Sequence, residues 1–214
     1  MGDGRYRAVI FDLGGVVVGS PLEAIAAYER EHGIPAGSIN RVVVGAGPGG
    51  AWSRLERGEL TLDAFYPVFD RECAGAGCAI SARTLLERVA AATVPRPAML
   101  EAIRRIRARG LLAAAITNNW ITEDAGSGAL RPHFDVFVES AAVGLRKPDP
   151  RIFRLACEQL GVEPAAAVFL DDIGANLKAA RALGMTTIKV TEPAAALETL
   201  AGLLGFALRE DTPA

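Results

Sequence analysis

Cysteine and histidine are scarce in this sequence, which has three cysteines and two histidines among 214 residues. Cys73 and Cys78 are neighbours in the sequence, but a zinc site between them would need further ligands. The histidines that would have to supply them, His32 and His133, are isolated. We therefore expect free thiols in a reducing compartment, Cys157 included, and no metal–thiolate centre.

The sequence also lacks a strong net charge, a long apolar run and an apolar leader. A formal net charge of −2 gives no reason to expect a nucleic acid or an anionic membrane as partner. The longest apolar runs, such as Leu111–Ile116, are far too short to span a bilayer. Met1–Arg7 is polar and shows no secretory signal. We therefore expect a cytoplasmic protein with neither nucleic acid nor membrane as partner, and the sequence leaves its oligomeric state open.

What the sequence does contain is a short apolar run that ends in a carboxylate and two glycines. Val9–Phe11 suits a strand buried on both faces of a parallel sheet, and Asp12 follows it directly. Gly14 and Gly15 allow a sharp turn and a close approach of the backbone to a ligand. In open α/β sheets ligands bind beyond the carboxyl ends of the strands, so Asp12 is a candidate for chemistry.

The next part of the chain reads as helical. Ser20 and Pro21 favour a helix start, because the serine can cap the helix and proline suits its first position. Amphipathic helical patterns continue to about residue 92, and the prolines of Thr93–Pro97 then interrupt them. We predict an all-helical cap over residues 16–95, inserted into a core formed by residues 1–15 and 96–214.

After Pro97 the pattern alternates between helix and strand. Such an order predicts an α/β fold with a doubly wound parallel sheet and helices on both faces. The further strands are expected at Leu111–Ile116, Phe134–Val138, Ala167–Leu170 and Thr186–Val190. Helices are expected from Pro97 to Gly110, from Asp149 to Gly161, from Gly174 to Gly184 and over Pro193–Leu204.

Polar side chains follow three of these predicted strands. They are Asp12, the pair Thr117 and Asn118, and the pair Asp171 and Asp172. The carboxyl ends of parallel strands share one edge of a sheet, so these groups can converge. Three carboxylates together repel one another unless a cation neutralises them, and hard oxygen ligands indicate Mg²⁺. Taken singly, each group also has an ordinary structural explanation as a turn hydroxyl or a helix N-terminal carboxylate.

Lys147 adds a positive charge to this set. Pro148 disfavours helical geometry at the residue before it, which suits a lysine that reaches back into a site. Lys147 can bind a phosphate as a point charge or hold the carboxylates apart. The competing interpretation is a solvated surface lysine.

The chain resembles the haloacid dehalogenase-like hydrolase superfamily over nearly its whole length, including the helical insert. Within it, the chain most resembles the N-terminal phosphatase domain of soluble epoxide hydrolases and the related N-terminal domain of acyl-CoA dehydrogenase family member ten. The matching segments are Phe11-Asp12-Leu13-Gly14-Gly15-Val16, Thr117-Asn118-Asn119-Trp120, Lys147-Pro148 and Phe169-Leu170-Asp171-Asp172-Ile173-Gly174-Ala175-Asn176-Leu177-Lys178.

This resemblance implies a metal-dependent phosphatase that acts on a small phosphorylated metabolite. Asp12 would be the nucleophile and would form an aspartyl-phosphate that water then hydrolyses. Asp12, the backbone carbonyl of Gly14 and Asp172 would hold Mg²⁺. Asp171 and Asn176 would support the metal shell.

The resemblance also implies how the phosphoryl group is held. Thr117 and Asn118 would bind its oxygens, and Lys147 would offset the negative charge of the nucleophile and the phosphate. Catalysis would then consist mostly of positioning and electrostatic stabilisation. The cap would close over the site and select the substrate.

Gly14 departs from the family pattern. Phosphatases of this superfamily usually carry a second aspartate two residues after the nucleophile, which protonates the leaving oxygen and later activates water. General acid–base catalysis is typically worth about 10²–10⁴-fold in rate. We therefore expect a phosphatase that is slow, narrow in substrate, or assisted by a proton donor from the cap or the substrate. It should be least impaired with acidic leaving groups such as those of acyl and aryl phosphates.

Two other functions remain open at this point. A module that binds a phosphorylated ligand or a partner protein, with weakened catalysis, would explain Gly14. A 2-haloacid dehalogenase would not need an acid either, because a halide leaves without a proton. Such dehalogenases do not use Mg²⁺, however, and Asp171 with Asp172 suits a metal.

Overall fold

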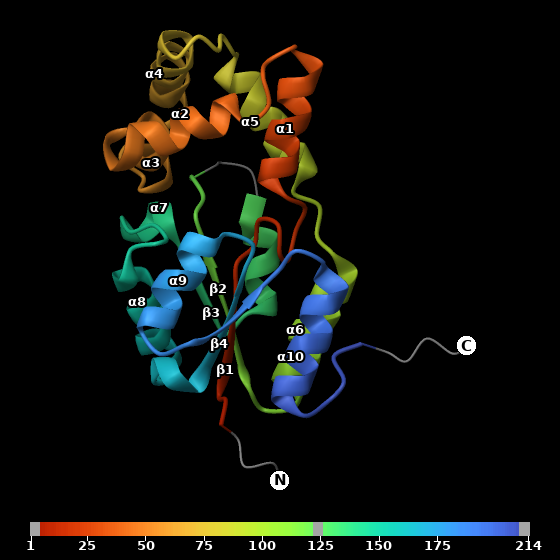
Figure 1. Ribbon diagram of the computed structural model, residues 1–214. Coiled ribbons are helices and arrows are strands. Elements are labelled where there is room, and N and C mark those ends of the chain that lie inside the picture. Colours follow the sequence, from red (N-terminus) through yellow and green to blue (C-terminus); the bar gives the residue numbers. More distant parts are fainter. Residues whose placement is uncertain (1–4, 122–125, 210–214) are drawn as a thin grey trace, which may run out of the picture.

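The computed structural model describes residues 5–121 and 126–209, so part of the polar start of the chain lies outside the described residues. In the described part, five parallel strands form one sheet in the order β3-β2-β1-β4-β5 (Figure 1). The strands are β1 (Ala8–Phe11), β2 (Leu112–Thr117), β3 (Val136–Glu139), β4 (Ala167–Asp171) and β5 (Thr186–Lys189). The predicted α/β fold with a parallel sheet is confirmed, and β1 lies at its centre.

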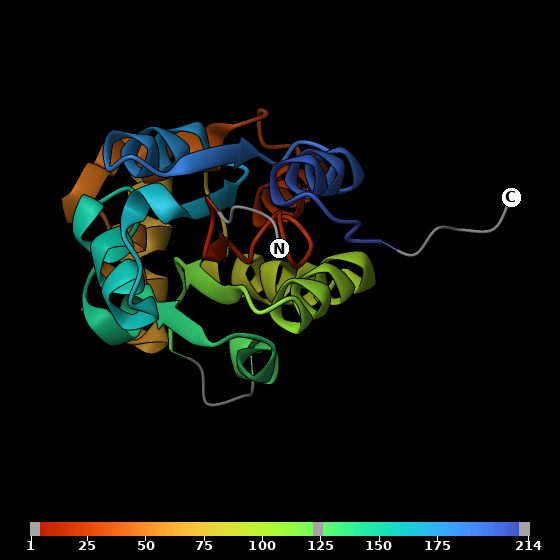
Figure 2. The same ribbon diagram turned by 90° about the horizontal axis from the view of Figure 1, so that it is seen from below.

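Helices cover both faces of the sheet (Figures 1 and 2). The helices of one face are α6 (Pro97–Ala108) and α10 (Pro193–Leu204), and those of the other are α8 (Pro150–Leu160) and α9 (Gly174–Ala182). Successive residues of β1 alternate between the two layers: Val9 and Phe11 pack with α6 and α10, and Ala8 and Ile10 with α8 and α9. This alternation explains why β1 is apolar throughout.

The helix starts follow the capping signals in the sequence. The Ser20 side chain accepts a hydrogen bond from the Glu23 amide at 3.4 Å, and Asp149 accepts one from the Arg151 amide at 2.9 Å. Proline occupies the first position of α6, α8 and α10, where no amide donor is needed. Local sequence therefore fixes where these helices begin.

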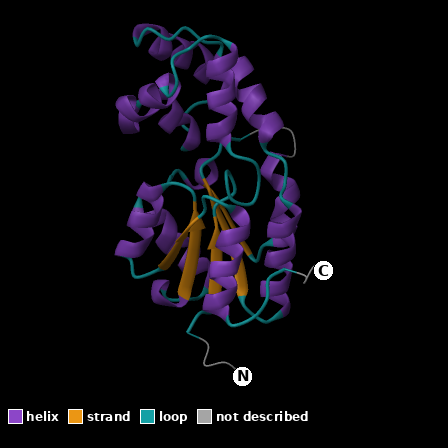
Figure 3. Cartoon of the chain, turned by 45° about the vertical axis from the view of Figure 1, so that its right-hand side comes forward, coloured by secondary structure: helices purple, strands orange, loops and turns teal. Residues whose placement is uncertain are grey.

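A separate group of helices lies beyond the carboxyl ends of the strands (Figure 3). It consists of α1 (Pro21–Glu31), α2 (Ser38–Ala46), the 3₁₀ turn η1 (Gly47–Gly49), α3 (Ala51–Glu56), α4 (Leu62–Gly75) and α5 (Ala82–Ala92). These helices bury a hydrophobic core of their own, in which Trp52 contacts Phe65 and Phe69. We call this group the cap. The exact domain limits at residues 15/16 and 95/96 stay a prediction.

Two short segments join the cap to the core, and they run side by side. The Gly19 amide donates to the Val94 carbonyl at 3.1 Å, and the Arg96 amide donates to the Val17 carbonyl at 2.9 Å. A Cβ atom at Gly19 would lie 2.0 Å from the Ala92 carbonyl oxygen, so no larger residue fits there without movement of the backbone.

The third strand differs from the prediction. The predicted range is Phe134–Val138, but β3 begins at Val136. Phe134 directly follows the 3₁₀ segment η2 (Gly126–His133), and its amide donates to the Arg131 carbonyl at 3.1 Å in a turn. The remaining short elements are α7 (Ser140–Val143) and η3 (Pro164–Ala166). Within the described ranges, no helix has the length and apolarity to cross a membrane.

Candidate active site

The sheet order brings the predicted polar groups together. Because β1 lies between β2 and β4, Asp12 emerges between the ends of both, and its amide donates to the Leu170 carbonyl at 2.9 Å. Thr117 is the last residue of β2, and Asp171 is the last residue of β4. Both are buried, as is Asp12, which is 6% exposed.

Lys147 is buried in this site. Only 1% of its surface is exposed, and its Nζ atom lies 2.7 Å from Oδ1 of Asp12 and 2.9 Å from Oδ2 of Asp171. Burial lowers the pKa of the Lys147 ammonium, but Asp12 and Asp171 outweigh it and raise that pKa above its usual value. The alternative of a solvated surface lysine is therefore wrong, and Lys147 is a fixed positive charge between two carboxylates.

Asp171 is held by three groups besides its own strand. The Ile173 amide donates to Oδ1 at 2.7 Å, and the Asn176 side chain donates to both carboxylate oxygens at 3.1 and 3.0 Å. With Lys147 on Oδ2, both oxygens of this buried carboxylate are satisfied. Asp171 and Asn176 therefore lie where they can orient Lys147.

Asp12 has a different environment. Its Oδ1 atom accepts from the Leu13 amide at 2.6 Å as well as facing Lys147, whereas Oδ2 accepts no hydrogen bond from any residue the structure describes. Burial is the main reason that the pKa of Asp12 rises to about 8, with Asp171 and Asp172 adding to it and Lys147 opposing it. The charge of Lys147 therefore does not fully compensate Asp12, Asp171 and Asp172.

The residues present fit a hard divalent cation. Asp12, Asp171 and Asp172 each offer an oxygen, and these atoms lie within 4.8 Å of one another. A Cβ atom at Gly15 would lie 2.3 Å from Oδ2 of Asp172, so glycine there makes room for this carboxylate. Carboxylate oxygens suit Mg²⁺, and a second positive charge would relieve their repulsion. Asp12, the Gly14 carbonyl and Asp172 stay the predicted ligands.

Gly14 faces the cap. A Cβ atom on Gly14 would lie 2.9 Å from Cγ and 3.0 Å from Cδ of Pro21, the first residue of α1. A side chain at position 14 would therefore meet a proline ring that a helix start holds in place. Pro21 therefore limits the room for any side chain at position 14.

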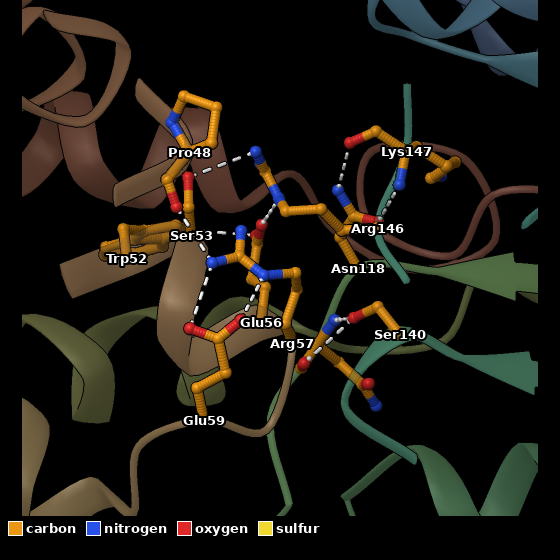
Figure 4. Close-up of polar contacts among 11 residues, drawn as sticks. Pro48, Trp52, Ser53, Glu56, Arg57, Glu59, Asn118, Ser140, Arg146 and Lys147 are labelled. Carbon is orange, nitrogen blue, oxygen red and sulfur yellow. Dashed lines mark hydrogen bonds and ion pairs between the residues drawn. The ribbon is translucent and has the colours of Figure 1, made fainter. Parts of the chain in front are cut away.

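Asn118 contacts the loop that carries the lysine. Its Nδ2 donates to the Lys147 carbonyl at 3.0 Å, and its Oδ1 accepts from the Lys147 amide at 2.8 Å. The Asn118 side chain thus holds the Lys147 backbone through two hydrogen bonds (Figure 4). Whether Thr117 and Asn118 also bind a phosphoryl group stays a prediction.

Two arginines near the site were not assigned a role from the sequence. Arg96 donates to the carbonyls of Gly15 and Val16 at 2.6 and 3.1 Å and so holds the loop that follows Asp12. Arg146 donates to Glu56 of α3 and links the core to the cap (Figure 4). The proline-rich joint at residues 93–97 and the position of Arg146 beside Lys147 were the signals available, but neither identifies a partner.

The sequence matches a known protein family. A family model described as haloacid dehalogenase-like hydrolase matches residues 6–184. The chain belongs to that family.

Two curated relatives extend the match. Acyl-CoA dehydrogenase family member 10 of Mus musculus is 42% identical over 99% of the chain, and bifunctional epoxide hydrolase 2 of Sus scrofa is 34% identical over 97% of it. The chain spans 20% and 40% of the lengths of these two proteins.

A solved structure shows the same fold. It is an enzyme of this family from Bacteroides thetaiotaomicron in complex with magnesium and inorganic phosphate. The TM-score is 0.60 at 19% identity, and the match covers 86% of this chain and 93% of that one.

Proposed function

We propose that this hydrolase is a Mg²⁺-dependent phosphatase that acts on a small phosphorylated metabolite, with Asp12 as the nucleophile. The observation that carries the proposal is the buried Lys147, which lies 2.7 Å from Asp12 and 2.9 Å from Asp171 beside a third carboxylate. Burying one lysine among three carboxylates costs stability, and such clusters of charge are typical of functional sites. The magnesium and phosphate bound by the Bacteroides thetaiotaomicron enzyme support this choice of ligand.

The chain's own groups account for the first half of the reaction. The free Oδ2 oxygen of Asp12 attacks phosphorus, the bond from phosphorus to the leaving oxygen breaks, and that oxygen leaves with the electron pair. Thr117 and the backbone amide of Asn118 would bind the phosphoryl oxygens, while Lys147 offsets their charge. When bound by Asp12, the Gly14 carbonyl and Asp172, Mg²⁺ supplies further positive charge beside the phosphoryl group.

The second half returns the enzyme to its starting state. Water attacks phosphorus in the aspartyl-phosphate, the bond from phosphorus to the Asp12 oxygen breaks, and inorganic phosphate leaves. In phosphatases with an aspartate at position 14, that residue takes the proton from this water. Here Gly14 cannot do so, and solvent has to accept it.

Gly14 also limits the leaving group. No carboxylic acid at position 14 protonates the departing oxygen, and even a Cβ atom there would lie 2.9 Å from Cγ of Pro21. Loss of a general acid costs about 10²–10⁴-fold, or roughly 3–5 kcal/mol of barrier. The preferred substrates are therefore those with leaving groups that are stable as anions, such as acyl phosphates.

A second candidate is a module that binds a phosphorylated ligand without turning it over. Gly14 and its neighbour Pro21 favour it, because the acid/base aspartate is absent and a Cβ atom at position 14 would meet the Pro21 ring. A 2-haloacid dehalogenase is the third candidate, and the cluster of Asp12, Asp171 and Asp172 speaks against a metal-free reaction.

Phosphate release from acetyl phosphate and p-nitrophenyl phosphate tests the proposal. We expect turnover with Mg²⁺, none in EDTA, and none in Asp12→Asn, with acetyl phosphate the better substrate. Inorganic phosphate that binds with Mg²⁺ while neither substrate is hydrolysed would identify the binding module. Metal-independent chloride release from a 2-chloro acid would identify the dehalogenase.

A further inference from the structure

Cap helix α3 contacts the core immediately beside the buried lysine. Arg146 lies in the loop between α7 and α8, and its Nε donates to Oε2 of Glu56 at 2.6 Å, while Nη1 donates to Oγ of Ser53 at 3.2 Å. The Glu56 side chain is 9% exposed and that of Arg146 is 27% exposed. Figure 4 shows Arg146 directed toward α3 from the neighbouring position to Lys147. This ion pair is therefore largely shielded from water, unlike most surface pairs.

Glu56 is itself fixed from the cap side. Its Oε1 atom accepts a hydrogen bond from Nε1 of Trp52 at 3.0 Å, and Trp52 packs among the phenylalanines of the cap core. Both carboxylate oxygens thus have a donor, one from each side of the boundary between cap and core. Arg146 consequently meets a carboxylate with a defined orientation.

A second contact ties α3 to the core at its end. Gly58 follows α3 with φ +70°, and a Cβ atom there would lie 2.4 Å from the Ala141 carbonyl oxygen of α7. Backbone therefore packs directly on backbone at this point. The ion pair of Arg146 and Glu56 belongs to a close docking surface.

The tryptophans mark the same boundary. Trp120, which follows Asn118 and Asn119 at the end of β2, packs against the hydrophobic core of the cap. Its ring lies 6.0 Å from that of Trp52 in an edge-to-face arrangement. These are the only two tryptophans in the sequence. Their interaction reports whether α3 is docked on the core.

We propose that Arg146 is a positioning residue, through which the docked cap fixes the loop that carries Lys147. The core holds this loop at two points, the Lys147 side chain on Asp12 and Asp171 and the Lys147 backbone on Asn118. The ion pair of Arg146 with Glu56 is the third point, and the one that depends on the cap. Lys147 is therefore fully positioned when α3 is docked, which couples the cap to the charge that acts on the phosphoryl group.

A double-mutant cycle tests this coupling. The variants are Glu56→Gln, Arg146→Gln and the double variant, each measured for kcat and KM with acetyl phosphate and Mg²⁺. Glu59→Gln is the matched control, because Glu59 pairs with Arg57 just beyond the end of α3 and inside the cap. The near-ultraviolet circular dichroism of the tryptophans reports docking, and far-ultraviolet spectra and melting temperatures show that each variant is folded.

We expect each single variant to lower kcat about tenfold, because small displacements of a catalytic charge are costly. KM should change less, the double variant should be no slower than either single one, and the tryptophan signal should weaken in all three. Glu59→Gln should match the wild type. Wild-type kcat in the single variants, or multiplicative effects in the double variant, would overturn the inference.

The kinetic part of this test rests on the proposed function, and a failure of that function can be recognised separately. If the wild type does not hydrolyse acetyl phosphate, the phosphatase proposal fails and the same cycle is measured on Mg²⁺-dependent binding of inorganic phosphate by calorimetry. Coupled losses of affinity and tryptophan signal in Glu56→Gln and Arg146→Gln support the positioning role. Additive or absent changes contradict it.

Discussion

A Cβ atom on Gly14 would lie 2.9 Å from Cγ of Pro21, so a side chain at position 14 would press against the first residue of the cap. Pro21 starts α1, with Ser20 capping the helix in front of it, and its ring cannot turn aside as a long side chain would. The room for a side chain at position 14 thus depends on position 21 as well. A single substitution at position 14 addresses only one of them.

We therefore predict that Gly14→Asp alone gains little activity and lowers stability, because the new side chain meets the Pro21 ring. Gly14→Asp with Pro21→Ala should recover the stability and hydrolyse p-nitrophenyl phosphate faster than the wild type. The gain has an upper limit of about 10²–10⁴-fold, the usual worth of a general acid and base. Pro21→Ala alone is the control. A full gain in Gly14→Asp alone would show that the contact with Pro21 does not matter.

Gly15 provides a second test, directed at the metal ligands. Gly15→Ala places a Cβ atom 2.3 Å from Oδ2 of Asp172 and also strains a backbone with φ +77°. Gly33→Ala is the matched control, because Gly33 has φ +65° and open space around it. Both should lose about 1–2 kcal/mol from the left-handed backbone, measured by urea unfolding in EDTA. Only Gly15→Ala should also weaken Mg²⁺ binding in calorimetry, and equal affinities in the two variants would argue against Asp172 as a ligand.

Much of the core fold could be predicted from the sequence because its signals are local. Val9–Phe11 reads as a buried strand without reference to any other segment, and the signals at Ser20 and Asp149 mark helix starts that the structure contains. The start of β3 was misplaced because Phe134 is apolar, as a strand residue would be, yet it ends a turn. Apolarity alone does not separate these two roles.

The convergence of these polar residues could be predicted from the sequence, but the contacts that hold them could not. Asp12 and Asp171 converge because each follows or ends a parallel strand, which sequence order indicates. The pairing of Arg146 with Glu56 joins residues 90 positions apart in different parts of the fold, and no local pattern encodes it. No local sequence pattern indicates that Pro21 lies close to Gly14 either.

The raised pKa of Asp12 predicts how stability depends on pH without metal. Asp12 titrates near its ordinary value of 3.8 when unfolded and at about 8 when folded, so between these values only the folded state holds the proton. The free energy of unfolding should therefore fall as pH rises through this range. Lys147 does not contribute, because its pKa is raised above 10.5.

Urea unfolding in EDTA at pH 5 and pH 8 measures this effect. The wild type should lose more stability between these values than Asp12→Asn, whose amide does not titrate. Mg²⁺ should reduce the loss in the wild type, because a cation favours the deprotonated carboxylate, and should have little effect on Asp12→Asn. Asp63→Asn, at an exposed cap carboxylate, controls for general charge effects. Equal pH dependence of wild type and Asp12→Asn would show that Asp12 is not protonated in the metal-free fold.

Lys147→Met tests the central charge directly. Methionine fills a similar volume but leaves Asp12 and Asp171 facing each other without a positive charge between them. Removing one partner from a buried ion pair typically costs about 3–5 kcal/mol, and we expect a loss of this size in urea unfolding with EDTA. Mg²⁺ should restore part of the stability, because a cation beside Asp12 compensates the same carboxylates.

Turnover of acetyl phosphate by Lys147→Met should be lost even with saturating Mg²⁺, because the phosphoryl oxygens lose their fixed positive partner. Lys178→Met, at an exposed lysine of α9, should leave stability and activity unchanged. A stable, active Lys147→Met protein would mean that the buried lysine neither compensates these carboxylates nor acts on the phosphate.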